Sequence, residues 1–175
     1  MYNAKLKPIS TPSNVSLINV TNGKKVIDII DTEISGYDTT DKALINTNAD
    51  INVTNATFSG NKSIEEIIKV TGNKTLTVDN VTFDDNETGK DLINVSKDFV
   101  ADGIVEFTNN AVSGDLIKAT NNITFNDEGT ISDNSIKGSA IKTDKDVTIS
   151  GEATIKDNTV NEDVIVSTNG KNNWR

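Results

Sequence analysis

Three acidic clusters are the residues of this sequence whose types could do chemistry. They are Asp84 with Asp85, Asp127 with Glu128, and Asp144 with Asp146. Enzymes that cleave polysaccharides use such carboxylates as acids and bases, often beside a lysine or arginine. Every cluster here falls in a predicted turn, where acidic side chains are common, and the only arginine is Arg175. We therefore expect no catalytic residue and no enzyme activity.

Metal chemistry is restricted by composition. Cysteine and histidine are absent, which excludes disulfides and metal sites built from thiolates or imidazoles. The turns "DDNETGKD" from Asp84 and "NDEG" from Asn126 offer oxygen atoms to a calcium ion. They lack the spacing of an EF-hand loop and of the nonapeptides of calcium β-rolls. The sequence does not decide whether one of these turns binds calcium. We expect no cofactor.

The net charge narrows the choice of partners. The chain has 17 basic and 26 acidic residues, a formal charge of −9, which is the wrong sign for binding a phosphate backbone. No stretch approaches the roughly 20 apolar residues that a membrane-spanning helix needs. We expect neither nucleic acid as a partner nor membrane insertion of this chain.

Two registers of apolar residues repeat along the chain in step. The first consists of Ile18, Ile45, Ile68, Ile93, Ile117, Ile141 and Ile165, at spacings of 27, 23, 25, 24, 24 and 24. The second, a core column, consists of Ile34, Phe58, Phe83, Phe107, Ile131 and Ile155, at spacings of 24, 25, 24, 24 and 24. Internal repeats of this length indicate a stacked repeat architecture.

A third apolar segment completes each unit, as in "VIDI" from Val26, "INV" from Ile51 and "LTV" from Leu76. Each unit thus holds three short runs of period two, separated by Asn, Asp, Gly and Lys, which predicts strands and turns. Such short units leave no room for crossover helices. We expect an all-β parallel β-helix with three short strands per coil, about 24 residues per coil and six to seven coils.

The domain organisation follows from where the repeat begins. Residues 17–175 are expected to form a single β-helix domain that is truncated or open at its C-terminal end, because "VIVSTNGKNNWR" starts a seventh coil at Val164 and stops after one strand. Residues 1–16, with Pro8 and Pro12, are expected to form an N-terminal cap or extended arm over the first coil.

Asparagine recurs at one position of the unit, three residues after the core column. The predicted structural ladder consists of Asn61, Asn86, Asn110, Asn134 and Asn158. Stacked in register, each amide can donate to the next one and so satisfy polar groups at a corner. Asparagine also tolerates the left-handed backbone conformation of a sharp corner. Both roles are structural.

The same residues resemble a known family. "FSGN" at Phe58, "FDDN" at Phe83 and "FTNN" at Phe107 match F-x-x-N, while "SGDLI" from Ser113 and "KGSAI" from Lys137 resemble G-G-A-I. These motifs are similar to those of the polymorphic outer-membrane proteins and adhesin-like repeat proteins of bacteria and methanogenic archaea. The resemblance implies a right-handed β-helix at the cell surface that adheres to host or neighbouring cells. Paired glycines are missing here.

The function expected from these observations is that of a non-catalytic, extracellular or cell-surface repeat domain, acting in adhesion or as a structural stalk. Its partner is then a host or neighbouring cell surface. In a first alternative the exposed coil ends bind other copies of the chain, because open strand edges recruit further strands, and build a head-to-tail fibre. In a second alternative the chain binds or degrades polysaccharides.

Overall fold

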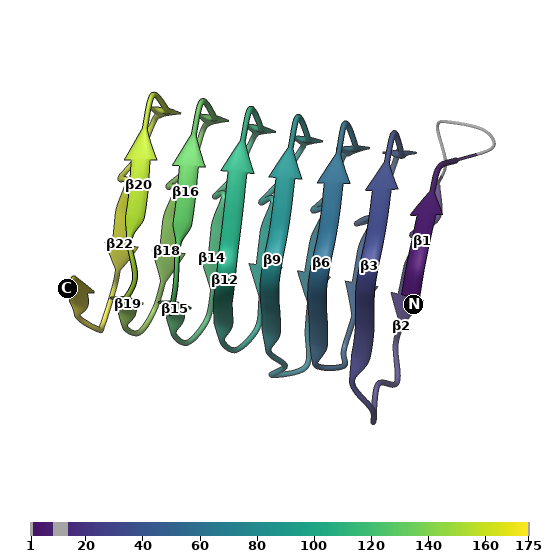
Figure 1. Ribbon diagram of the computed structural model, residues 1–175, viewed down its shortest axis with the longest axis horizontal. Helices are drawn as coiled ribbons and strands as arrows, with labels where there is room; N and C mark the ends of the chain where they lie inside the picture. Colours follow the sequence, from purple (N-terminus) through teal and green to yellow (C-terminus); the bar gives the residue numbers. More distant parts are fainter. Residues whose placement is uncertain (1, 9–13, 175) are drawn as a thin grey trace.

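The chain folds as an all-β parallel solenoid in a computed structural model that describes residues 2–8 and 14–174. Its strands form three parallel sheets that run the length of the molecule, so each coil contributes to all three (Figure 1). In Figure 1 the long strands run upward on the near side, the chain returns on the far side, and each coil advances toward the C-terminus. This winding is right-handed, the usual sense of connections between parallel strands. The predicted fold class is confirmed.

We name the three sheets by the length and place of their strands. The long sheet contains β1 (Tyr2–Leu6), β3 (Ile27–Ser35), β6 (Ile51–Ser59), β9 (Leu76–Asp84), β12 (Phe99–Thr108), β15 (Ile123–Phe125), β16 (Gly129–Ser132), β19 (Val147–Ile149), β20 (Ala153–Lys156) and β23 (Asn172–Trp174). The corner sheet contains β4 (Asp38–Thr39), β7 (Lys62–Ser63), β10 (Glu87–Thr88), β13 (Ala111–Val112), β17 (Ser135–Ile136) and β21 (Thr159–Val160). The return sheet contains β2 (Ile18–Val20), β5 (Ile45–Thr47), β8 (Ile68–Val70), β11 (Ile93–Val95), β14 (Ile117–Ala119), β18 (Ile141–Thr143) and β22 (Ile165–Ser167).

The count of three strands per coil is confirmed, but the strands divide the unit differently from the sequence prediction. The runs expected to form two separate strands merge into one strand of nine or ten residues in β3, β6, β9 and β12. A residue with positive φ bends each of these strands near its middle: Asp31, Asn55, Asn80 or Gly103. Asparagine, aspartate and glycine tolerate this conformation, so the strand bends there and pairs with its neighbours on both sides of the bend. The third strand is the two-residue corner strand, which the sequence did not predict.

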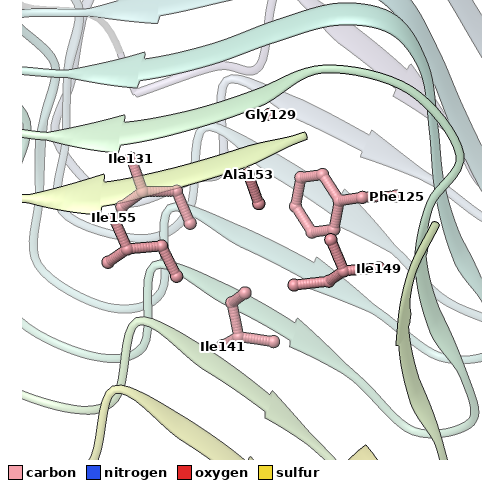
Figure 2. A pocket seen from close by; sticks show the side chains of 7 residues that line it. All are labelled: Phe125, Gly129, Ile131, Ile141, Ile149, Ala153 and Ile155. Carbon is pink, nitrogen blue, oxygen red and sulfur yellow. The ribbon is translucent and has the colours of Figure 1, made fainter. Parts of the chain in front are cut away.

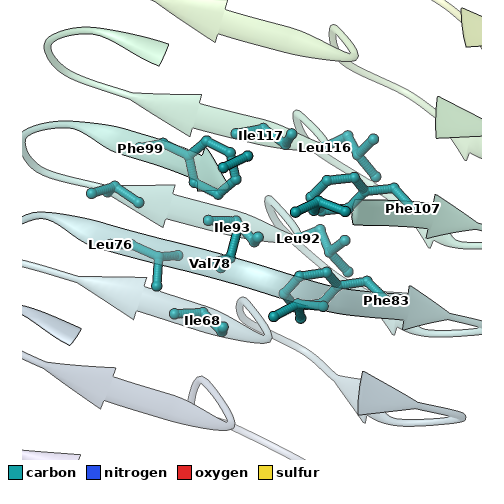
Figure 3. Close-up of a cluster of buried hydrophobic side chains, with 14 of the residues drawn as sticks. Ile68, Leu76, Val78, Phe83, Leu92, Ile93, Phe99, Phe107, Leu116 and Ile117 are labelled. Atoms are coloured by element: carbon teal, nitrogen blue, oxygen red, sulfur yellow. The ribbon is translucent and has the colours of Figure 1, made fainter. Parts of the chain in front are cut away.

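The core is narrow and lies between the three sheets. Along each strand buried and outward residues alternate, as in the pattern of β9, because successive side chains of a strand point to opposite faces. In the core column Phe58 pairs with Phe83, and Phe83 with Phe107, across successive coils. Their rings stack with centroids 4.9 and 5.0 Å apart, and Figure 3 shows Phe83 and Phe107 one above the other.

The core column continues as isoleucine on both sides of the aromatic stack. Ile34 lies opposite Phe58, while Phe107 lies opposite Ile131, which in turn lies opposite Ile155. All members are buried except Ile155, which is partly buried in the last coils. The members of the first register also pair with one another, for example Ile93 with Ile117.

Both ends of the described chain add strands to the long sheet. Residues 2–6 of the predicted N-terminal arm form β1, which pairs in parallel with β3, whereas residues 9–13, including Pro12, lie outside the described residues. At the other end β23 follows β22 and pairs with β19. The expectation that the seventh coil stops after one strand is therefore wrong, because the residues after Gly170 run back along the long sheet. Among the described residues, no helix is long and apolar enough to cross a membrane.

Candidate functional site

The asparagine ladder lies at the corner between the long sheet and the corner sheet. Each side-chain amide donates to the Oδ1 atom of the next asparagine along the solenoid. The four Nδ2–Oδ1 distances are 3.0 Å from Asn61 to Asn86, 3.0 Å from Asn86 to Asn110, 3.0 Å from Asn110 to Asn134 and 2.8 Å from Asn134 to Asn158. The ladder predicted from the sequence is thus present across five coils.

Every internal member of the ladder uses its full hydrogen-bonding capacity. Asn86 also donates to the carbonyl of Phe58, 2.9 Å away in the preceding coil, and its Oδ1 accepts from both the side chain and the backbone N–H of Asn61. The first four members are buried. An unpaired buried amide would be costly, and within the described residues no buried side-chain nitrogen or oxygen lacks a partner.

The left-handed conformation at this corner belongs to the residue before each ladder asparagine. The positions are Gly60, Asp85, Asn109, Asp133 and Asp157, together with Gly36 before Tyr37 in the first coil, and their φ angles lie between 53° and 71°. The ladder asparagines themselves therefore do not adopt the left-handed conformation, which was the second role predicted for them. Their side chains bond along the solenoid while the preceding residue makes the turn.

A second polar column lies just before the return strands and was not predicted from the sequence. Glu66, Asp91, Asp115 and Ser139 occupy equivalent places in successive coils and are all buried. Oδ1 of Asp91 accepts the backbone N–H of Asp115 at 2.8 Å, and Oδ1 of Asp115 accepts the backbone N–H of Ser139 at 2.8 Å. These carboxylates therefore hold neighbouring coils together, as the ladder does at the other corner.

Lysines on the return strands pair with the second polar column. Lys118 Nζ lies 3.8 Å from Asp91 and 3.6 Å from Asp115, and Lys142 Nζ lies 3.6 Å from Asp115. In an earlier coil Lys69 Nζ lies 3.3 Å from Glu66. Each buried carboxylate thus has a cation nearby, which reduces the cost of burying its charge.

Glu66 of this column and its neighbour Glu65 differ in pKa because their surroundings differ. Burial raises the pKa of Glu66, and Lys69 only partly opposes this effect. The hydrogen bond from Lys90, at 2.7 Å, holds the pKa of the Glu65 carboxyl below its ordinary value. A raised pKa in a cleft would suggest a catalytic acid. Glu66 instead lies inside the wall of the solenoid and faces an amine.

One signal in the sequence could have located this column. Glu66, Asp91 and Asp115 are 25 and 24 residues apart, and each directly precedes a pair of large apolar residues, as in "DLI" at Asp91 and at Asp115. Asp115 and Ser139 stand where the resembled motif has its second glycine. The position within the repeat identifies the members of this column better than the residue type does.

The carboxylates proposed for chemistry from the sequence do not converge. Asp85, Asp127, Glu128 and Asp144 are exposed, while Asp84 and Asp146 are partly exposed, and they are distributed over different corners of the solenoid. Among the residues that the structure describes, no group of three or more acidic side chains is placed to hold a metal ion. The oxygen-rich turns therefore do not form a common site.

The outward face of the long sheet is polar and acidic. Strands β3, β6, β9 and β12 contain seven aspartates and glutamates and no lysine or arginine. Several of these carboxylates accept hydrogen bonds from a neighbouring coil: Asp31 from Asn55, Asp84 from Thr108 and Asp102 from Asn126 of the next coil, and Glu106 from Thr82 of the preceding coil. This surface can offer carboxylates, hydroxyls and amides to a partner.

Hollows in the described part of the molecule are small or shallow, and one lies over the long sheet beside Lys5, Glu33 and Thr57. An apolar void of about 10 Å³ lies where the core column changes from phenylalanine to isoleucine, lined by Phe125, Gly129, Ile131, Ile141, Ile149, Ala153 and Ile155 (Figure 2). It is no larger than the space of one water molecule and has no polar group to bind one. A shallow surface hollow over β7 and β10 contains the Lys62–Glu87 ion pair, at 2.8 Å, and the exposed Ile64.

Comparison with known proteins adds no assignment, since no family model, curated protein or solved structure matches the chain.

Proposed function

We propose that the chain is a non-catalytic β-helical repeat domain of a bacterial or archaeal surface protein, acting outside the cell in adhesion or as a structural stalk. The observation that carries this proposal is the use of the buried polar side chains. The amides of the ladder and the carboxylates of the second polar column form hydrogen bonds between coils. Such columns build and stiffen a rod.

The resemblance to adhesin-like repeats supports the same proposal. It rests on the F-x-x-N motifs, whose phenylalanines stack in the core and whose asparagines form the ladder. These residues serve the rod, so attachment must use outward residues. The long sheet is the widest outward surface and is rich in hydroxyls, amides and carboxylates, which can bind polar groups of a cell surface.

Antibody labelling of intact cells that produce the protein tests its location. We expect labelling without permeabilisation, and labelling only after permeabilisation would contradict the proposal.

Adhesion is tested by adding purified protein to host or neighbouring cells. Replacing outward Thr57 and Thr130 of the long sheet with arginine should reduce binding, whereas Asn19→Arg on the return sheet should not. If the variant with arginine at positions 57 and 130 still binds cells, attachment does not use the long sheet. If the unaltered protein does not bind cells either, only the role of a structural stalk remains.

A second candidate is a subunit of a head-to-tail fibre, in which coil ends bind other copies of the chain. The observation that favours it is that Ile155, Val160 and Ile165 in the last coils are only partly buried, although the same columns are buried elsewhere. Light scattering across a concentration series tests it. Growth in mass that Ile165→Lys abolishes is expected of a fibre, whereas a constant mass of 18.8 kDa would rule it out for this chain.

A further inference from the structure

The tetrapeptide Thr-Asn-Gly-Lys occurs twice, at the same corner of the solenoid. Thr21–Lys24 lies between β2 and β3, and Thr168–Lys171 lies between β22 and β23. In both, the turn connects the return sheet to the long sheet. Both glycines also pack tightly, Gly23 against Ala49 and Gly170 against the backbone of Lys145. The two sites thus form a matched pair within one chain.

An Asn-Gly peptide can modify itself without an enzyme. The glycine backbone nitrogen loses its proton and attacks Cγ of the asparagine side chain, the new C–N bond closes a succinimide ring, and ammonia leaves. Water then opens the ring at either carbonyl, giving aspartate or isoaspartate. Because the glycine nitrogen is the nucleophile, a hydrogen bond that holds its N–H slows the first step.

The first site is held closed by a residue of the next coil. The Gly23 N–H donates to Oδ1 of Asn48, and Nδ2 of Asn48 donates to the carbonyl of Thr21. One amide therefore fixes the backbone on both sides of Asn22. Ring closure at Asn22 requires this clamp to open first, so the hydrogen bonds protect it.

The second site has no such clamp. Within the described part of the chain, the Gly170 N–H donates to no group, and the Asn169 side chain is exposed. The residues on either side are held: the Asn169 N–H donates to the carbonyl of Asp144 at 3.1 Å, and the Lys171 N–H donates to Asp146 at 2.7 Å. The nucleophilic nitrogen is thus the free member of an otherwise fixed turn.

We propose that Asn169 is a site of spontaneous deamidation and that its isoaspartate product loosens β23 from β19. Isoaspartate adds one carbon to the backbone of the four-residue path from β22 to β23, which shifts the register of β23. Both products also add a negative charge to a turn whose backbone N–H groups bond to Asp144 and Asp146, and like charges repel. The edge of the long sheet would then open as the protein ages.

Ageing the full chain at mildly alkaline pH, followed by peptide mass spectrometry, tests the modification. We expect the Asn169 peptide to gain the mass of deamidation several times faster than the Asn22 peptide, about fivefold if the clamp has the strength of one ordinary hydrogen bond. Asn48→Ala should accelerate the reaction at Asn22 by a similar factor and leave Asn169 unchanged. Equal rates at the two sites of the unaltered chain, or a faster reaction at Asn22, would overturn the assignment of Asn169.

Hydrogen exchange of the aged protein tests the effect on the fold. We expect amides of β19 and β23 to lose protection in step with isoaspartate at residue 169, and Asn169→Ser to keep that protection after the same incubation. Deamidation without any change in exchange would overturn the structural part of the proposal. Loss of protection in aged Asn169→Ser as well would show another cause.

Discussion

At the scale of single residues, polar side chains inside the wall decide how coils are joined. A ladder amide satisfies two donors and two acceptors from neighbouring coils, as Asn86 does with Asn61, Asn110 and Phe58. The net gain from making such bonds is modest, but the cost of leaving one group buried and unpaired is large. The ladder therefore specifies the register of the coils.

Removing one rung should be far more damaging than removing an outward asparagine. Asn86→Ala leaves the backbone N–H and one side-chain N–H of Asn61 without acceptors, and it removes the side-chain donor to the carbonyl of Phe58. We expect the free energy of unfolding to fall by about 3 kcal/mol, measured by denaturant titration. As a control, Asn52→Ala removes an exposed bond to Asp28 and should cost no more than about 0.5 kcal/mol. Equal costs would show that the ladder does not hold the corner.

Glu66 offers a test of the second polar column through pH. Because its pKa is raised by burial, its charged form is disfavoured in the folded protein, and this penalty grows as pH rises from the ordinary glutamate range through the raised pKa. Glu66→Gln should therefore stabilise the protein by about 1 kcal/mol at neutral pH, with the difference shrinking on acidification. Thermal melts at several pH values measure it. A less stable variant at neutral pH would mean that the bond to Lys69 outweighs burial.

The residue scale also shows what the sequence could predict. The ladder was predictable because one residue type recurs in register. The turn position before it is filled by glycine, aspartate and asparagine in different coils, so no single letter marks it. The second polar column mixes glutamate, aspartate and serine, and acidic residues near turns have an ordinary explanation at the surface. Burial, which sets their role, depends on the fold.

At the scale of elements, neighbouring strands compensate for each other's volume. The inward column that includes Val53, Val78 and Ala101 contains Phe125 in the next coil. The adjacent inward column has Val105 and then Gly129. A Cβ atom at Gly129 would lie 2.9 Å from the Phe125 ring. The large and the small residue therefore form a pair.

A double-mutant cycle measures this pairing. Gly129→Val should cost about 2 kcal/mol because it overpacks the core, and Phe125→Val should cost about 2 kcal/mol because it leaves a cavity. The double variant reproduces the valine pair of β9, Val78 with Val81, and should cost about 1–2 kcal/mol less than the sum. Additive costs in denaturant titrations would contradict a direct contact.

Element boundaries were harder to predict than element positions. Period-two runs predict where strands lie, but they cannot show that a bend at Asp31 or Asn55 continues a strand. A two-residue corner strand such as β7 is too short for any periodicity. Pairing with the next coil, which is a property of the stack, defines both.

At the scale of the whole molecule, each coil contacts only its neighbours, so stability is close to a sum of coil and interface contributions. The fold class was predictable because this architecture repeats the same constraints in every coil. The proposed function depends on outward residues, which those constraints do not fix. The central claim of the structure is that polar columns bond the coils into one continuous rod.

Residue-resolved hydrogen exchange of the native protein tests that claim most directly. The backbone N–H groups of Asn86 and Asn110 lie at a corner, yet each donates to the amide oxygen of the next rung, at 3.0 and 2.9 Å. We expect them to exchange as slowly as the amide of Ile93 in the return sheet, and Asn86→Ala to accelerate exchange at Asn61 in particular. Exchange of the rung amides as fast as that of exposed turn amides would contradict a ladder that joins the coils.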